Sequence, residues 1–160
     1  MDAVSLHLIS NHVPIIGVFF GIVVLGYGMS RQSPPTLAAA YIAFLISAAM
    51  GLVAYFSGEG AEEVAEKLPG VTHEIIEVHE EAAVYTLVSY VVLALASLLG
   101  MLKVKNHYHR IRKLAIVILL LSIIAFATAA YTGYTGGQVR HTELRNTSLP
   151  APAGQDNSSR

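Results

Sequence analysis

Long apolar runs without charged side chains dominate the chain. Four runs contain no Lys, Arg, Asp or Glu, and they cover residues 13–29, 37–56, 82–102 and 114–134. A helix needs about 20 mainly apolar residues to cross a hydrocarbon core of about 30 Å. The last two runs are apolar on every side, which favours lipid contact, whereas a soluble bundle would carry polar residues on a solvent face. The pattern predicts an all-α, polytopic membrane protein built as a four-helix bundle.

One connection between the predicted helices is substantial. Residues 57–81 hold most of the glutamates of the chain, and their first half predicts a short acidic helix that Pro69 and Gly70 close. Thr72 then has the position of an N-cap for a helix that runs into the third crossing. We expect one membrane domain over residues 1–145, followed by a flexible polar tail over residues 146–160.

The basic residues gather in two of the connections. The turn between the first two helices and the connection between the last two hold most of them: Arg31, Lys103, Lys105, Arg110, Arg112 and Lys113. The positive-inside rule places these connections in the cytoplasm, so both termini are expected on the outer, periplasmic side. All 11 acidic residues of the chain lie on that predicted outer side. The charges therefore mark it as the side where partners and cofactors are expected.

Composition narrows the chemistry. Only 13% of the residues are charged, 54% are hydrophobic and the mean hydropathy is +0.56, whereas a soluble domain carries about 25% charged residues. Because 10 Lys and Arg stand against 11 Asp and Glu, a nucleic-acid partner is not expected. The absence of cysteine excludes disulfides, thiolate metal sites, iron–sulfur clusters and cysteine nucleophiles. Metal chemistry would have to use carboxylates, methionine or the seven histidines.

Five histidines fall on the predicted outer side: His7, His12, His73, His79 and His141. His12 directly precedes the first apolar run and His79 lies three residues before the third, so both are about one turn from the hydrocarbon boundary. Two imidazoles that face each other from different helices suit the six-coordinate iron of haem b. We expect His12 and His79 to be the axial ligands.

The end of the fourth helix adds two further candidates, because Arg140 and His141 follow a glycine-rich stretch. The Arg140 guanidinium can pair with a haem propionate or with a carboxylate of Glu77, Glu80 or Glu143. His141 is a second cofactor-binding candidate. Small residues recur at helical spacing in the second and fourth runs, where they either leave a gap for a macrocycle or pack helix against helix.

Four short motifs carry a resemblance to a family: Asn-His-Val-Pro-Ile (11–15), Ser-Gly-Glu-Gly (57–60), His-Glu-Glu-Ala (79–82) and Gly-Gly-Gln-Val-Arg-His (136–141). Over about residues 5–141, the chain resembles a group of small four-helix inner-membrane proteins of bacteria classed as a domain of unknown function. The resemblance implies a multi-pass protein of the bacterial inner (cytoplasmic) membrane that associates with redox or metal proteins. In architecture the chain is also similar to b-type cytochrome membrane subunits.

Three functions remain open. The first is a haem-b electron-transfer protein or cytochrome-like subunit that contacts membrane lipid and docks other subunits, or a soluble basic electron carrier, at the acidic loop. The second is a non-haem copper, iron or zinc site at the outer surface, built from His12, His73, His79, His141 and nearby glutamates. The third is a non-catalytic anchor or assembly subunit. No catalytic residues are expected, so the chain is predicted to be an electron-transfer subunit rather than a stand-alone enzyme.

Overall fold

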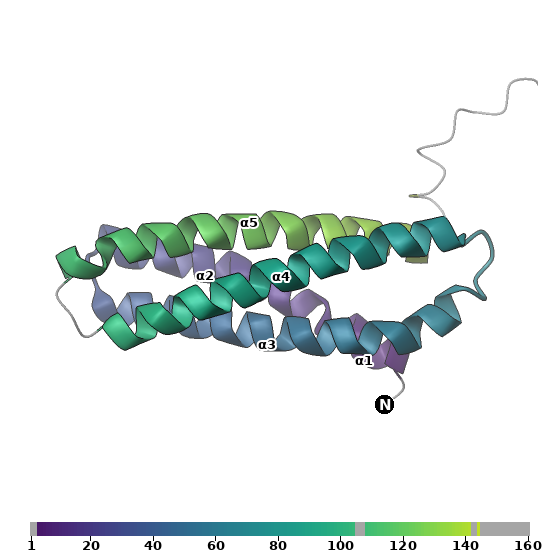
Figure 1. Ribbon diagram of the computed structural model, residues 1–160, viewed down its shortest axis with the longest axis horizontal. Helices are drawn as coiled ribbons and strands as arrows, with labels where there is room; N and C mark the ends of the chain where they lie inside the picture. Colours follow the sequence, from purple (N-terminus) through teal and green to yellow (C-terminus); the bar gives the residue numbers. More distant parts are fainter. Residues whose placement is uncertain (1–2, 105–107, 142–143, 145–160) are drawn as a thin grey trace, which may run out of the picture.

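The computed structural model describes residues 3–104, 108–141 and 144. This part of the chain contains helices and no strand, as Figure 1 shows. The helices are α1 (Ala3–Ser10), α2 (His12–Ser30), α3 (Pro34–Ala65), α4 (His73–Lys103) and α5 (Tyr108–Arg140). The prediction of an all-α chain is confirmed, whereas the predicted flexible tail over residues 146–160 lies outside the described residues.

Four helical segments are long and apolar enough to cross a membrane: Ser5–Ser30, Pro34–Ala65, His73–Lys103 and Ile111–Arg140. Each contains one of the apolar runs, and the first joins most of α1 to α2. Many large apolar side chains are exposed on the bundle surface, among them Phe20, Phe56 and Leu95. This outer surface matches the lipid contact that the sequence predicts.

Local chemistry explains where the long helices begin. Pro34 and Pro35 occupy the first positions of α3, where a missing backbone N–H costs nothing. Thr72 caps α4, because its side chain accepts a hydrogen bond of 3.4 Å from the backbone N–H of Ile75. Glu74 lies in the first turn of α4, where the helix dipole favours a negative charge. The predicted cap at Thr72 is confirmed.

The acidic segment differs from its prediction. Residues 57–65 do not form a separate short helix, because they continue α3 without a break as far as Ala65. No proline interrupts this stretch, and extending an existing helix is far easier than nucleating a new one. The chain then turns through Gly70, whose φ of 73° is a left-handed conformation that glycine adopts without strain.

The helices form an antiparallel bundle in which α3 is central. α1 and α4 pack on α3, and α2 packs on both α3 and α5 (Figure 1). The start of α1, the α3–α4 connection and the end of α5 lie together at one end of the bundle, which we call the termini end. The turn between α2 and α3 lies at the opposite end. The described segments that the sequence assigns to one side of the membrane therefore do lie at the same end of the bundle. That this end faces the periplasm stays a prediction.

Glycines in α3 and α4 allow these two helices to pack closely. A Cβ atom at Gly51 would lie 2.5 Å from the ring of Tyr90, and a Cβ atom at Gly100 would lie 2.7 Å from the ring of Tyr41. Each helix thus inserts a buried tyrosine ring against a glycine of the other. Gly51 belongs to the small-residue pattern of the second run, and at this position the pattern packs helix against helix, which is one of its two interpretations.

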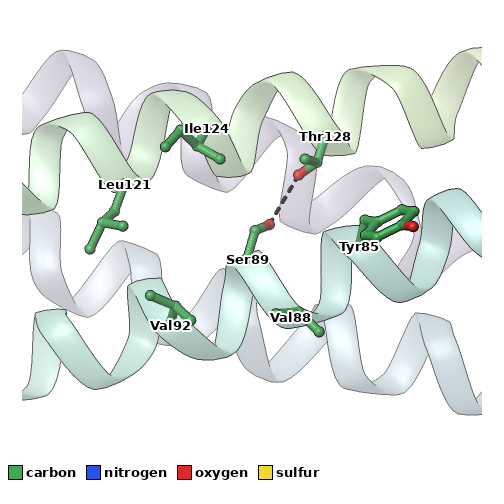
Figure 2. A pocket seen from close by; sticks show the side chains of 7 residues that line it. All are labelled: Tyr85, Val88, Ser89, Val92, Leu121, Ile124 and Thr128. Atoms are coloured by element: carbon green, nitrogen blue, oxygen red, sulfur yellow. Dashed lines mark hydrogen bonds between the residues drawn. The ribbon is translucent and has the colours of Figure 1, made fainter.

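Two part-buried hydroxyl pairs join α4 to α5. The Oγ1 atoms of Thr86 and Thr132 lie 2.8 Å apart, and Ser89 Oγ lies 3.0 Å from Thr128 Oγ1. Figure 2 shows the hydrogen bond of the second pair. Ser89 and Thr128 also line a hollow of about 370 Å³, whose other lining side chains are mainly apolar. In an environment without water, such pairs hold two helices in register.

Removing the Thr86–Thr132 pair tests this contribution. We expect a double-mutant cycle with Thr86→Val and Thr132→Val to give a coupling energy of about 0.6 kcal/mol, and at most about 1.7 kcal/mol. Reversible unfolding in detergent micelles measures it. Strictly additive single-variant effects would show that the hydroxyl pair contributes nothing beyond its separate packing.

Candidate functional site

His79 lies half-buried on α4 at the termini end and contacts α5. Its Nδ1 atom is 3.1 Å from Thr135 Oγ1. The Thr135 hydroxyl already donates its only proton to the carbonyl oxygen of Thr132, at 3.0 Å. In the arrangement with this bond, Thr135 accepts from Nδ1 of His79, which then carries the proton. The neutral imidazole therefore keeps the lone pair on Nε2.

The ring of His79 lies directly against the backbone of α5 at Gly136. A Cβ atom at this position would lie 2.9 Å from Cε1 and 3.3 Å from Nδ1 of His79. Any larger residue would push the ring away from its hydrogen bond to Thr135. The glycine-rich end of α5 is thus part of the site, because it provides the space that the imidazole occupies.

His7 approaches the same region from α1. Its Nδ1 atom is 2.9 Å from the carbonyl oxygen of Ala54 on α3. A carbonyl oxygen only accepts, so Nδ1 of His7 also carries the proton and the lone pair is again on Nε2. Ser57 donates its hydroxyl proton to the same Ala54 carbonyl, at 3.0 Å, and its Oγ lies 3.4 Å from His7 Nδ1. This cluster fastens α1 to α3.

The two imidazoles form a pair across the bundle. Their ring centroids are 6.4 Å apart and the ring planes meet at 88°. Metal-binding histidines usually donate the N–H of the nitrogen that does not bind the metal to a carbonyl or another acceptor, which fixes the ring and the tautomer. Both His7 and His79 show this arrangement. The pair can therefore offer two Nε2 lone pairs, one from α1 and one from α4.

His12 does not join this pair. It is exposed, and its Nδ1 atom lies 3.1 Å from the carbonyl oxygen of Leu8 on the preceding turn. No ring contact or hydrogen bond links His12 with His79 in the described part of the chain. The backbone stays nearly helical through Asn11, so His12 points about 140° away from His7 around the axis. Only one of the two can face the bundle interior.

The remaining predicted residues lie at the surface of the termini end. His73 is the first residue of α4 and is exposed, and Arg140 is the exposed last residue of α5. His141 follows, also exposed, and its backbone N–H donates to the Gly137 carbonyl at 2.8 Å. Among the predicted site residues, the structure places His79 alone in the interior pair. The cofactor roles of the others remain predictions.

The sequence analysis does not single out His7 as a ligand candidate, and it is the burial pattern of the structure that places His7 on the inner face of the first crossing. Buried residues recur along α2 at spacings of three and four, from Pro14 through Val18 and Gly21. Continuing this spacing backward reaches Ser10, which is buried, and then His7. The apolar run begins only at residue 13, so it does not indicate which face of the helix His7 occupies.

The number of metal ligands that the site offers is small. In the ranges that the structure describes, no group of three or more His, Asp or Glu side chains is placed to hold a metal ion. Structural and catalytic zinc sites use three or four protein ligands. Two imidazoles are instead the number that the iron of a six-coordinate haem takes from the protein.

The fold and the site together define an all-α chain with four potential membrane crossings and an imidazole pair in the interior of one end. Comparison with protein-family models, curated proteins and solved structures finds no match for this chain. The resemblance to a family of bacterial inner-membrane proteins therefore stays a prediction that rests on the four motifs.

Proposed function

We propose that this chain is an integral membrane electron-transfer protein that holds haem b, and that it works as a subunit of a respiratory or other redox complex. The observation that carries the proposal is the imidazole pair of His7 and His79. The two rings come from different helices, and each has its Nδ1 proton engaged and its Nε2 lone pair free. This donor set fits the two axial positions of a haem iron.

In this proposal His79 and His7 would hold the haem iron through their Nε2 atoms. Haem, when bound, supplies reversible one-electron transfer at its iron. The Ala54 carbonyl and the Thr135 hydroxyl would hold the two rings in place and, by accepting the Nδ1 protons, make each Nε2 a stronger donor. His12, the ligand that the sequence favours, would need to turn away from the Leu8 carbonyl to take the place of His7.

A bound copper, iron or zinc ion is the second candidate, and one atom favours it. Oδ1 of Asn11 is buried without a hydrogen-bond partner, four residues after His7 on the same helical face. An amide oxygen is a possible third ligand beside two imidazoles, and imidazole accommodates all three metals. A site of this kind would need no space for a macrocycle.

The surroundings of the site suggest where partners bind. Residues 59–81 hold eight Glu and one Lys, and the end of α3 and the start of α4 bring this segment to the termini end. We propose that this surface faces the periplasm of a bacterial inner membrane and docks a basic electron carrier or other subunits of the complex. Electrostatic steering of this kind raises association rates and weakens as salt screens the charges.

An absorption spectrum tests the proposal directly. Protein purified from haem-replete cells should show the α band of a b-type cytochrome in the reduced-minus-oxidised difference, and elemental analysis should find iron. A metal without the b-type band would support the second candidate. A protein with neither haem nor metal would contradict both, and would leave the histidines the structural role of a membrane anchor or assembly subunit.

Histidine variants identify the ligands. We expect His79→Ala and His7→Ala to lose most of the b-type absorbance, because each removes one axial nitrogen, while His73→Ala retains it because His73 is exposed at the start of α4. His12→Ala is the deciding variant. Retained absorbance in His12→Ala with loss in His7→Ala supports the pair seen in the structure, and the opposite result would restore His12 as the ligand.

A further inference from the structure

Two hydroxyl groups in the interior of α4 lack a hydrogen-bond partner. Tyr90 is 2% exposed and Ser97 is 0% exposed, and neither Tyr90 OH nor Ser97 Oγ is bonded. The two residues are seven positions apart, so they lie on one face of α4, about 10 Å apart along its axis. This is the face that packs on α3, because the ring of Tyr90 lies against Gly51.

The unpaired state of Ser97 is a departure from the pattern of this protein. The other buried serines bond a carbonyl oxygen three or four residues back: Ser10 with His7, Ser47 with Ala43, Ser57 with Ala54 and Ser122 with Leu119. Ser97 could bond the carbonyl of Leu93 or Ala94 in the same way. Among the buried serines and threonines that the structure describes, Ser97 alone has an unbonded hydroxyl.

Neither hydroxyl can be satisfied by bulk water. Ser97 has no surface exposure, and the Tyr90 ring is confined by Gly51, where a Cβ atom would lie 2.5 Å from it. Lipid offers no donor or acceptor at this depth. Buried polar groups without a protein partner are usually bonded to an ordered water molecule, which needs only a space of about one probe sphere.

These hydroxyls continue a polar line that begins at the candidate site. His79 bonds Thr135, and one turn further into the bundle Thr132 bonds Thr86. Tyr90 follows Thr86 by four residues, which is about one more turn of α4 towards the opposite end of the bundle. Ser97 lies two turns beyond Tyr90. Polar side chains are thus spaced along the bundle interior from the imidazole pair towards the opposite end.

We infer that the interface between α3 and α4 binds ordered water inside the membrane-spanning bundle, at the Tyr90 hydroxyl and at the Ser97 hydroxyl. The ligand is water. A water molecule can donate a hydrogen bond to each hydroxyl oxygen or accept one from each hydroxyl proton. It can also donate to a neighbouring backbone carbonyl oxygen, which has a second lone pair. This inference does not depend on what the imidazole pair binds. It predicts a hydrated interior in a bundle whose outer surface is apolar.

Hydroxyl-radical footprinting tests the inference, because radiolysis of a bound water labels the side chains next to it. Full-length protein in lipid nanodiscs is exposed to an X-ray pulse, and labelling is read by mass spectrometry and corrected for intrinsic side-chain reactivity. We expect Tyr90 to be labelled several times faster than Phe44, which is equally buried and apolar. Exposed Tyr85 serves as the upper reference. Labelling of Tyr90 at the rate of Phe44 would overturn the inference.

A variant gives an independent measurement. If water satisfies the Tyr90 hydroxyl, Tyr90→Phe removes one hydrogen-bond partner of that water and should leave the melting temperature unchanged or lower it. If the hydroxyl is truly unpaired, the same variant removes a buried polar group without a partner and raises the melting temperature, which would count against the inference. Tyr85→Phe is the matched control, because its hydroxyl is exposed and bonds Glu81 on the surface.

Discussion

Replacing Gly21 by valine is expected to lower the free energy of unfolding by roughly 1–3 kcal/mol or more. A side chain at this position of α2 would collide with the ring of Phe44 on α3. Phe44 is 0% exposed and belongs to the hydrophobic core, so its ring has no free space into which it can move. The α2–α3 packing must therefore open to admit the new side chain. Reversible unfolding in detergent, followed by circular dichroism, measures the loss.

Gly26 provides the matched control on the same helix. A Cβ atom there would meet nothing within 4 Å. Gly26→Ala should therefore leave stability unchanged or raise it by up to about 1 kcal/mol, since alanine favours the helical state over glycine. Equal effects of Gly21→Val and Gly26→Ala would show that the close approach of α2 and α3 at Gly21 does not limit the fold.

Replacing Gly136 by valine is expected to weaken the proposed binding of haem by about 10–100-fold, the usual effect of disturbing a group that orients a metal ligand. The new side chain would occupy the space of the His79 ring, because a Cβ atom at this position lies 2.9 Å from Cε1. The hydrogen bond between Nδ1 and Thr135 would then be lost. Titration of the purified apoprotein with haem, read by absorbance, measures the change.

Gly133 is the control for this second prediction, one turn earlier on α5. A Cβ atom there would make only an ordinary contact of 3.4 Å with Ile15. Gly133→Ala should bind haem like the wild type. Wild-type binding by Gly136→Val would show that the placement of His79 against α5 is not required. Failure of the wild-type protein itself to bind haem would instead contradict the proposed function.

The helices follow from local sequence chemistry to a large extent. Charge-free apolar runs locate the crossings because hydrocarbon excludes both charged side chains and unpaired backbone groups. Pro34 and Pro35 fix the start of α3, and Thr72 fixes the start of α4. The ends are harder to locate. α3 extends to Ala65 because a helix propagates through a polar, glutamate-rich stretch once it exists, and hydropathy carries no signal for this extension.

The site was predictable only in part. The place of His79 just before an apolar run makes it a candidate ligand, but the same reasoning does not find the histidine with which its ring pairs. His7 and His12 both lie near the start of the first crossing, and their distances from the hydrocarbon boundary do not separate them. His7 and His12 differ in their direction around the helix axis. Because the helix is nearly continuous through Asn11, the imidazole of His7 points towards α3 and that of His12 points outward.

The sequence by itself determined that the chain is helical, that four segments can cross a membrane, and that acidic residues and most histidines gather at one end. Those properties depend on the free energy of transferring each side chain between water and hydrocarbon. This free energy is a local property that adds up along the chain. Only the tertiary structure decided that His7 meets His79, that Gly136 makes room for the His79 ring, and that Tyr90 and Ser97 are buried without protein partners. Each of these features depends on how one helix is rotated about its axis relative to another. Packing between residues that are far apart in the sequence sets this rotation.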